Sequence, residues 1–329
     1  MKVCIVGASG HGSFVFRAME QDPSIKVVGV APGSEGEDAS KMAKMAEKQG
    51  QSAKLYDDYR EMLDQEKPDV VAVNCFFGDH GKVNLEVLQR RIHLFAEKPL
   101  ATELEELELL EKEYKAANVE LAAMLGLRYL PAFYTAWHAV QDGAIGQVRL
   151  LTAQKSYRLG TRPDFFKDRK TYGGTIPWVG SHAIDWIYWF AGEEFVSVAA
   201  QHSAMYNNGL GDLEMSALCQ FRFSNEVMGS ANIDYLRPAK APTHGDDRVR
   251  VAGTKGVIEV MDGKVTLIND QSEGIQELAL LDAPAFFAEF AKQVRGEGKC
   301  LVSAKDSFEV TKACLLAREA ADKQEIVYF

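Results

Sequence analysis

The chain of 329 residues carries a formal net charge of -10, and 47% of its residues are hydrophobic. This length suits two domains or one domain with a large addition, and the apolar content is enough for a buried core. The acidic balance argues against a nucleic acid or an acidic membrane surface as the main partner, so neither is expected.

Cysteine usage indicates the compartment. The five cysteines are scattered and odd in number, and no two have metal-ligand spacing: Cys4, Cys75, Cys219, Cys300 and Cys314. We therefore expect free thiols in a reducing compartment, with no disulfide framework and no metal site. The apolar run near the N-terminus is too short for a signal peptide, and no run reaches transmembrane length. A cytoplasmic location is the expectation.

The first twelve residues carry the strongest local signal. The apolar run Lys2–Val6 predicts a buried strand and leads directly into a glycine-rich turn, Gly7–Gly12. Apolar residues with helical spacing follow at Phe14, Val15, Ala18 and Met19. Strand, glycine turn and helix form the context in which such a turn binds a dinucleotide. Glycine lets the backbone approach a pyrophosphate, and the helix directs unpaired N–H groups toward it.

The glycine pattern departs from the G-x-G-x-x-G spacing at one position. Gly7 and Gly12 are the first and third glycines, while Ser9 stands at the middle one. Gly10 is placed to take over part of the close approach, and we expect His11 to face solvent or cofactor rather than act as a base. The alternative is an ordinary tight turn.

The next segments alternate between strands and helices. The predicted strands are Ile25–Val30, Leu55–Tyr56, Asp69–Val73, Ile92–Ala96 and Val119–Met124, and the predicted helices are Asp38–Gln49, Asp57–Asp64, Asp79–Arg91 and Glu103–Ala117. A capping box of Thr102 and Glu105 is expected to open the last of these helices. The alternation predicts an α/β fold with a doubly wound parallel Rossmann sheet, on which ligands bind beyond the carboxyl ends of the strands.

Residues that follow the strands are therefore candidate cofactor ligands. Ser34 follows the second strand and is able to bond either a ribose hydroxyl or a phosphate. The acids Glu35, Glu37 and Asp38 come slightly late for the ribose position, so the choice between NAD and NADP stays open. Asn74 directly follows a later strand and is a further candidate.

A Glu97-Lys98-Pro99 tripeptide follows the strand Ile92–Ala96. A lysine facing a cofactor cleft is a candidate proton donor, because desolvation lowers the pKa of an amine. The alternative is a surface ion pair between Glu97 and Lys98 ahead of a helix.

These motifs, with others in the second half, resemble the Gfo/Idh/MocA family of NAD(P)-dependent oxidoreductases, the glucose–fructose oxidoreductase and inositol dehydrogenase group. The resemblance covers nearly the whole chain and rests on Gly7–Gly12, Glu97–Pro99, Arg128 with Pro131, Gly173–Asp185 and Arg250–Gly256. It implies an NAD or NADP cofactor and a sugar, cyclitol or polyol substrate. It also implies a second domain on an open sheet that joins subunits, hence a homodimer or homotetramer.

The second half has strands in series. The predicted strands are Gln147–Tyr157, Val196–Met205, Glu214–Phe223, Glu226–Tyr235, Arg248–Ala252, Val257–Val260 and Lys264–Ile268, followed by helices Ala283–Arg295 and Ala304–Asp322. Such a run favours a largely antiparallel sheet in an α+β domain. We therefore predict a dinucleotide-binding domain in residues 1–125 and a substrate-binding and oligomerisation domain in residues 126–329.

A histidine and an aspartate lie three residues apart in the predicted helix Gly180–Ala191. His182 and Asp185 therefore share one helix face. A histidine near a carboxylate suits proton transfer at neutral pH, although such a pair is often structural. By the resemblance, Lys98 and His182 match the lysine and histidine that line the substrate pocket, and Asp185 matches the last acid of the pattern. These three are the predicted catalytic residues, and Arg128 is expected to bind substrate.

The chain departs from the family pattern four residues before His182. Many members carry a proton-handling aspartate there, and this chain has Trp178. Trp178 either stacks on an apolar sugar face as a substrate-binding residue or is plain packing. Either Lys98 and His182 suffice, or Asp185 contributes, or the reaction is not alcohol oxidation. The alternatives are an NAD-using lyase or glycosidase with no net redox change, and a non-catalytic ligand sensor.

A basic segment precedes the glycine pair. It contains Arg158, Arg162, Lys167, Arg169, Lys170 and Tyr172. The segment either binds a carboxylate or phosphate of the substrate, with Tyr172 among the substrate-binding residues, or forms a solvated arm against a neighbouring subunit. The segment His244–Asp247 does not have the spacing of a standard metal site, and we expect a pocket edge or a structural turn there.

Overall fold

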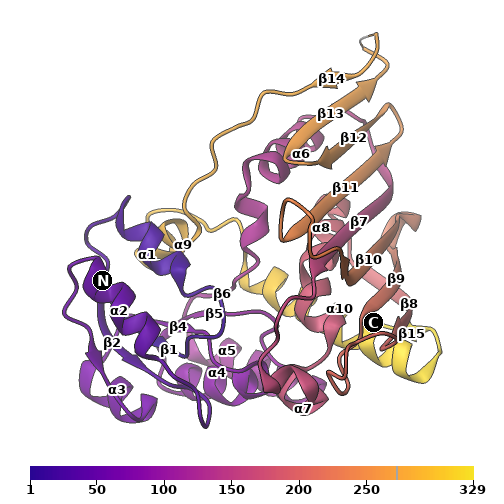
Figure 1. The fold of residues 1–329 in the computed structure, drawn as a ribbon. Helices are drawn as coiled ribbons and strands as arrows, with labels where there is room; N and C mark the ends of the chain where they lie inside the picture. Colours follow the sequence, from indigo (N-terminus) through magenta and orange to yellow (C-terminus); the bar gives the residue numbers. More distant parts are fainter. Residues whose placement is uncertain (272) are drawn as a thin grey trace. The chain divides into compact units, whose positions relative to one another are not determined.

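The computed structural model describes residues 1–271 and 273–329, which form two compact units. The N-terminal unit contains Met1–Met124, Lys170–Gly173 and Pro284–Thr311, and the C-terminal unit contains Leu125–Arg169, Gly174–Ala283 and Lys312–Phe329. Segments distant in the sequence share a unit, as the colours of Figure 1 show. Residues 170–173 and 284–311 lie in the N-terminal unit, although the predicted division at residue 126 assigns them to the second domain.

The N-terminal unit is built on a parallel sheet of six strands. Their order is β3-β2-β1-β4-β5-β6, and every neighbouring pair is parallel. The strands are β1 (Lys2–Val6), β2 (Lys26–Ala31), β3 (Lys54–Leu55), β4 (Val70–Val73), β5 (His93–Ala96) and β6 (Leu121–Ala123). The central strands β1 and β4 are buried and apolar apart from the exposed Lys2 at the start of β1, as expected of strands covered on both faces. The predicted Rossmann sheet is confirmed.

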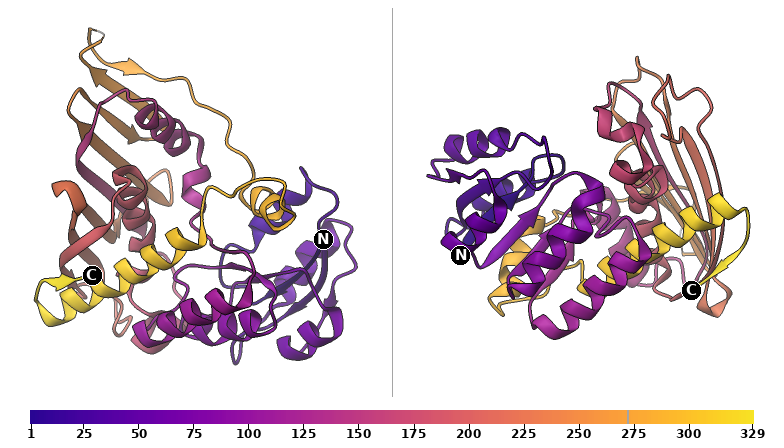
Figure 2. Two further views of the ribbon diagram at one scale, coloured as in Figure 1. Left: turned by 180° about the vertical axis from the view of Figure 1, so that it is seen from behind. Right: turned by 90° about the horizontal axis from the view of Figure 1, so that it is seen from below.

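Helices cover both faces of this sheet. They are α1 (Ser13–Met19), α2 (Ser40–Lys48), α3 (Tyr59–Glu66), α4 (His80–Gln89), α5 (Leu104–Ala117) and α9 (Phe286–Val294). Figures 1 and 2 show α1 beside α9, and α4 beside α5 on the opposite face. The ring of Phe95 in β5 lies 4.9, 5.0 and 5.3 Å from the rings of Phe286, Phe287 and Phe290 in α9. These aromatic contacts hold α9 in the N-terminal unit.

The predicted capping box of α5 is wrong. Glu103 is the N-cap, with an extended backbone at φ -128° and ψ 147°, and no side chain caps the helix. Thr102 therefore lies one residue outside the position that its hydroxyl would need to occupy in order to cap the helix.

The C-terminal unit is built on a nine-stranded sheet ordered β14-β13-β12-β11-β7-β10-β9-β8-β15. The strands are β7 (Val148–Arg158), β8 (Phe195–Ser203), β9 (Ser216–Phe223), β10 (Met228–Arg237), β11 (Gly245–Gly253), β12 (Gly256–Met261), β13 (Lys264–Asn269), β14 (Gln276–Glu277) and β15 (Val327–Tyr328). Only the β7–β10 pair is parallel among the pairs the structure describes. The mostly antiparallel sheet predicted for the second half is confirmed.

Helices lie on one face of this sheet. They include α6 (Pro131–Gln141) and α8 (Ser181–Ala191), while α10 (Ala304–Lys323) spans both units. Short elements complete the chain: 3-10 turns at Phe77–Asp79, Gly126–Tyr129, Asp164–Lys167 and Ser224–Glu226, the one-turn helix α7 at Arg169–Tyr172, and a π-helical turn at Ile176–Gly180. The helix α6 was not among the predicted elements.

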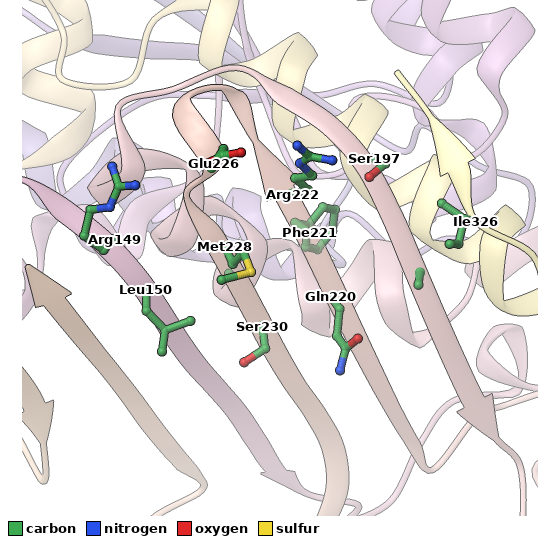
Figure 3. Close-up of a pocket in the computed structure, with 12 residues that line it drawn as sticks. Arg149, Leu150, Ser197, Gln220, Phe221, Arg222, Glu226, Met228, Ser230 and Ile326 are labelled. Atoms are coloured by element: carbon green, nitrogen blue, oxygen red, sulfur yellow. The ribbon is translucent and has the colours of Figure 1, made fainter.

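The other face of the nine-stranded sheet is open. Along β7, Leu151, Ala153 and Lys155 are buried on one side of the strand, whereas Leu150, on the other side, is 45% exposed. Met228 of β10 pairs with Leu150 in the sheet and is also exposed. Figure 3 shows Leu150 and Met228 lining a pocket together with Ser230 and Gln220, and apolar groups therefore occupy part of this surface.

Candidate functional site

The glycine turn between β1 and α1 is fastened to two strand ends. Gly7 has φ +85°, and a Cβ there would lie 2.3 Å from the backbone nitrogen of Cys75, so only glycine fits. The Gly7 N–H donates to the carbonyl of Ala31 at 2.8 Å, and the Ser9 N–H donates to the carbonyl of Asn74 at 2.7 Å. The turn therefore lies at the carboxyl ends of β2 and β4, where a parallel sheet binds its ligand.

The other two glycines of the turn allow close packing of side chains. A Cβ at Gly10 would lie 2.5 Å from Oε2 of Glu97, and one at Gly12 would lie 3.0 Å from Sδ of Met42. The space at Gly10 therefore admits the Glu97 carboxylate directly against the turn.

Glu97 is a fully buried carboxylate at the end of β5. Its Oε2 accepts the backbone N–H of His11 at 2.7 Å and lies 2.6 Å from Nδ1 of the same residue, while Oε1 lies 3.8 Å from Nζ of Lys98. Burial acts to raise the pKa of Glu97, but His11 and Lys98 outweigh it and hold that pKa at about 2. Glu97 is therefore a fixed negative charge at neutral pH, beside the turn and beside Lys98.

Glu37 is a functional candidate that the sequence prediction left out of the site. Its Oε1 accepts hydrogen bonds from the Ala8 N–H and the Ser9 hydroxyl, both at 2.9 Å, and its Oε2 accepts one from the Gly33 N–H at 3.0 Å. The carboxylate thus bridges the glycine turn and the segment after β2, which is where a dinucleotide fold binds the adenosine ribose. The sequence feature that could have identified Glu37 is its place as an acid in the short glycine-containing loop after β2.

Asn74 and Ser34 complete the edge of the sheet. Asn74 is fully buried, and within residues 1–271 and 273–329 neither atom of its side-chain amide has a hydrogen-bond partner. An unsatisfied buried amide is costly, so this one fits a site that a polar ligand completes. The Ser34 hydroxyl accepts the N–H of Phe76 at 3.1 Å. The glycine turn Gly7–Gly12, which we call the glycine cradle, and the Asn74 amide together fit a bound dinucleotide.

Two further predicted residues belong to the N-terminal unit. Lys98 follows β5 and is only 2% exposed. Tyr172 is buried with its ring 6.2 Å from that of Phe77. A Cβ at Gly78 would lie 2.3 Å from the carbonyl oxygen of Lys170, so the segment around Tyr172 packs tightly on this turn. The N-terminal unit therefore gathers every predicted cofactor residue, with Tyr172, at its sheet edge and adjoining turns.

The C-terminal unit brings two predicted site residues into direct contact. Nε of Arg128 lies 3.0 and 3.1 Å from the two carboxylate oxygens of Asp185, and Nη2 lies 2.6 Å from Oδ1. Both side chains are 1% exposed, and the guanidinium also lies over the ring of Trp189 at 5.2 Å. The pair is a buried, bidentate ion pair that joins the start of the C-terminal unit to α8.

The start of α8 carries His182 and the preceding tryptophan. Trp178 lies half-buried in the π-helical turn, and its backbone N–H donates to the carbonyl of Gly174 at 3.2 Å. His182 is buried one residue after α8 begins. A Cβ at Gly180 would lie 2.5 Å from Cδ1 of Ile233. The turn and the first residues of α8 therefore pack directly on β10.

A buried carboxylate holds the start of this turn. Glu214 accepts the backbone N–H of Thr175 at 2.9 Å through Oε2, and the Thr175 hydroxyl donates to the Glu214 carbonyl at 2.7 Å. Arg169 lies within ion-pair distance of Glu214 and satisfies its charge. These bonds fix the backbone from which Trp178 projects.

Metal ligands do not gather in the described residues. Among them, no group of three or more histidine, cysteine, aspartate or glutamate side chains is arranged to hold a metal ion.

Family profiles match consecutive parts of the chain. Residues 1–125 match the oxidoreductase family with an NAD-binding Rossmann fold, and residues 133–259 match the GFO/IDH/MocA C-terminal domain. With the glycine cradle described above, this defines an oxidoreductase whose N-terminal unit is an NAD-binding Rossmann domain. The chain belongs to the Gfo/Idh/MocA family of oxidoreductases, as the sequence motifs predicted.

Individual relatives share different parts of this architecture. A solved structure from Thermotoga maritima, described only provisionally as an oxidoreductase, is 46% identical, covers 100% of both chains and superposes with a TM-score of 0.96. YrbE, an uncharacterised oxidoreductase of Bacillus subtilis, is 26% identical over 86% of this chain and 79% of its own. Myo-inositol 2-dehydrogenase of Thermotoga maritima is 27% identical over 71% of this chain and 69% of its own.

Proposed function

We propose that the protein transfers a hydride between NAD and a sugar, cyclitol or related polyol. The observation that carries this proposal is the buried Lys98 beside the ionised Glu97, at the same sheet edge as the glycine cradle. Bound NAD supplies the redox step, and the protein contributes orientation and proton handling. The relationship to myo-inositol 2-dehydrogenase supports the choice of substrate class.

Each predicted site residue has a distinct task in this proposal. Lys98 bonds the reacting oxygen and moves its proton, and His182 positions the substrate or relays that proton. Asp185 contributes through its ion pair with Arg128, which fixes α8 and therefore His182. Trp178 stacks on an apolar sugar face, and Tyr172 contributes to substrate binding.

The test is turnover with NAD and a panel of myo-inositol, aldoses and open-chain polyols. We expect the absorbance of reduced nicotinamide to rise with at least one member. Consumption of a glycoside with no accumulation of reduced cofactor would favour the alternative, an enzyme that oxidises and re-reduces one substrate. Binding of NAD and sugar without any turnover would favour a ligand sensor.

We further propose that the protein prefers NAD to NADP and that Glu37, which follows β2 and bonds the glycine turn, binds the adenosine ribose. A carboxylate there bonds the ribose hydroxyls and repels a 2′-phosphate. Glu37→Gln keeps the hydrogen-bonding shape and removes the charge, so we expect NADP affinity to rise by about tenfold or more relative to NAD. Glu35→Gln, which neutralises an exposed acid two residues away, is the matched control. If the ratio of the NADP to the NAD dissociation constant is the same in Glu37→Gln and Glu35→Gln, the role of Glu37 in cofactor preference is contradicted.

The open face of the nine-stranded sheet is the proposed subunit interface. Exposed apolar side chains on it include Leu150, Leu218 and Met228 (Figure 3 shows the first and last). Burying this surface in a homodimer or homotetramer would remove apolar area from water. Sedimentation velocity tests this proposal, and a monomer at micromolar concentration would contradict it.

A cytoplasmic location is part of the proposal. All five cysteines are buried and none of them forms a disulfide in the described parts of the chain, which is the pattern of a protein made in a reducing compartment. Separately, no helix among the described residues is long and apolar enough to cross a membrane. Fractionation of cells that produce the protein tests the location.

A further inference from the structure

Arg162 has a half-buried positive charge with no neutralising carboxylate beside it in the described parts of the chain. Its guanidinium lies over the ring of Tyr235 at 4.7 Å and over that of Phe166 at 5.3 Å. One nitrogen donates to the carbonyl of Arg158 at 3.2 Å, but the buried Nε has no acceptor in residues 1–271 and 273–329. Nor do those residues include a carboxylate within 4.0 Å of this guanidinium. An arginine held this way is poised for an external anion.

The Arg162 guanidinium belongs to a larger group of cationic and aromatic side chains on the covered face of the sheet. The ring of Tyr235 lies 6.3 Å from that of Tyr157, which in turn lies 4.7 Å from the His244 ring. Nζ of Lys155 lies over the Tyr157 ring at 4.6 Å. We call these five residues the cationic cluster. They come from β7, β10, the segment before β11 and the segment after β7, so the fold assembles them from distant parts of the chain.

Positive charge exceeds negative charge in the cationic cluster. Asp247 pairs with Lys155 at 2.6 Å, which uses one charge of each sign and leaves Arg162 uncompensated. The nearby Asp246 is engaged by Arg237 and Arg248, at 3.2 and 2.8 Å. An excess of positive charge on a partly buried surface is unusual in a chain of net charge -10.

His244 adds a neutral hydrogen-bonding group at the same place. Burial lowers its pKa, and the positive charges of Arg162, Arg158 and Lys155 lower it further, whereas Asp247 acts in the opposite direction. Its imidazole is therefore uncharged at neutral pH and able to donate a hydrogen bond.

The cationic cluster adjoins the helix that carries His182. Nζ of Lys155 lies 5.6 Å from the ring of Trp186, which is in α8 four residues after His182. Gly180, just before α8, packs on Ile233, and Ile233 lies two residues before Tyr235 on the same face of β10. The cationic cluster therefore extends the surface that begins at the start of α8, within the C-terminal unit.

We propose that the cationic cluster is a substrate subsite for a carboxylate, so that the substrate is an acidic sugar or polyol such as an aldonic or uronic acid. The planar fork of Arg162 matches a carboxylate, and the half-buried ring of Tyr157 offers apolar surface to the carbon chain. A solvated arm against a neighbouring subunit would not require the guanidinium to lie over two aromatic rings with its Nε buried. The inference rests on the proposed function, because it names the substrate class for that reaction.

The test measures binding rather than turnover. Calorimetry on the NADH-loaded protein compares gluconate and glucuronate with the neutral glucitol and glucose, and adds glucose 6-phosphate as a second anion. We expect at least one sugar acid to bind about tenfold more tightly than its neutral partner. Arg162→Gln is expected to abolish that advantage while changing affinity for the neutral ligands less than about twofold.

Two further variants complete the design. Arg162→Lys keeps the charge without the fork and should retain part of the preference for acids. Arg250→Gln removes an exposed guanidinium from the other face of the same sheet and should change nothing.

Equal binding of acid and neutral ligands by the parent protein would overturn the inference, as would an equal loss for both classes in Arg162→Gln. Tighter binding of the sugar phosphate than of every acid, lost in Arg162→Gln, would overturn the carboxylate and assign the subsite to phosphate. Acid binding that depends on Arg162, with no turnover of any substrate, would support the subsite and contradict the proposed dehydrogenase activity.

Discussion

Replacing Lys98 by methionine is expected to lower kcat by about 10²–10⁴-fold, the usual contribution of a positioned proton-transfer group. The substitution keeps the length and apolar stem of a side chain that is 2% exposed, and it removes only the amine. Glu97 retains its hydrogen bond from the His11 N–H and its contact with the His11 ring, so the adjoining glycine turn should keep its structure. Initial rates at saturating NAD and substrate measure the effect.

Two matched variants separate proton transfer from charge. Lys98→Arg keeps a positive charge that does not deprotonate at neutral pH. It should therefore preserve ligand binding but restore little of the turnover. Lys82→Met makes the same change at an exposed position of α4 and should leave both ligand binding and turnover unchanged. Calorimetry must show that Lys98→Met still binds NAD. Turnover equal to that of the parent in such a variant would exclude Lys98 from catalysis.

The local sequence was sufficient where a single segment determines its own structure. The strand Lys2–Val6 was predicted with its observed bounds, because an apolar run that stops at a glycine offers few alternatives. The order of strands and helices followed in the same way. Short-range patterns failed at Thr102, where the backbone enters the helix one residue later than the capping-box motif requires. They also missed α6, whose apolar residues lie on most of its surface and therefore give a weak periodic signal.

The candidate site was harder to predict because tertiary structure assembles it. Glu37 lies six residues beyond β2, and only the folding back of its loop brings the carboxylate to the Ala8 N–H. Arg128 and Asp185 are 57 residues apart, and the sequence predicted them as separate substrate-binding and catalytic residues. Their pairing depends on where α8 packs, which no local pattern encodes. The chemical types were visible in the sequence, whereas the partners were not.

The buried pair of Arg128 and Asp185 leads to the second large expected effect. Removing one partner leaves the other charge buried without compensation, which costs about 3–5 kcal/mol in the free energy of unfolding. We therefore expect both Arg128→Met and Asp185→Leu to be strongly destabilising. Urea unfolding followed by tryptophan fluorescence measures this in the relevant unit, because all four tryptophans, Trp137, Trp178, Trp186 and Trp189, lie in the C-terminal unit.

The double variant distinguishes a paired charge from two independent packing losses. With both charges removed, the desolvation cost disappears as well, so Arg128→Met with Asp185→Leu should be less destabilised than the sum of the single changes by about 2 kcal/mol or more. The Arg250–Glu259 pair is the control, because its side chains are 46% and 47% exposed and solvent screens their interaction. Its cycle should yield about 1 kcal/mol or less. Additive losses at Arg128 and Asp185 would contradict the assignment of this pair as the contact that holds α8.

If the pair acts by positioning His182, Asp185→Asn should lower kcat more than it raises KM in the fraction that remains folded, because the histidine is still present but misplaced.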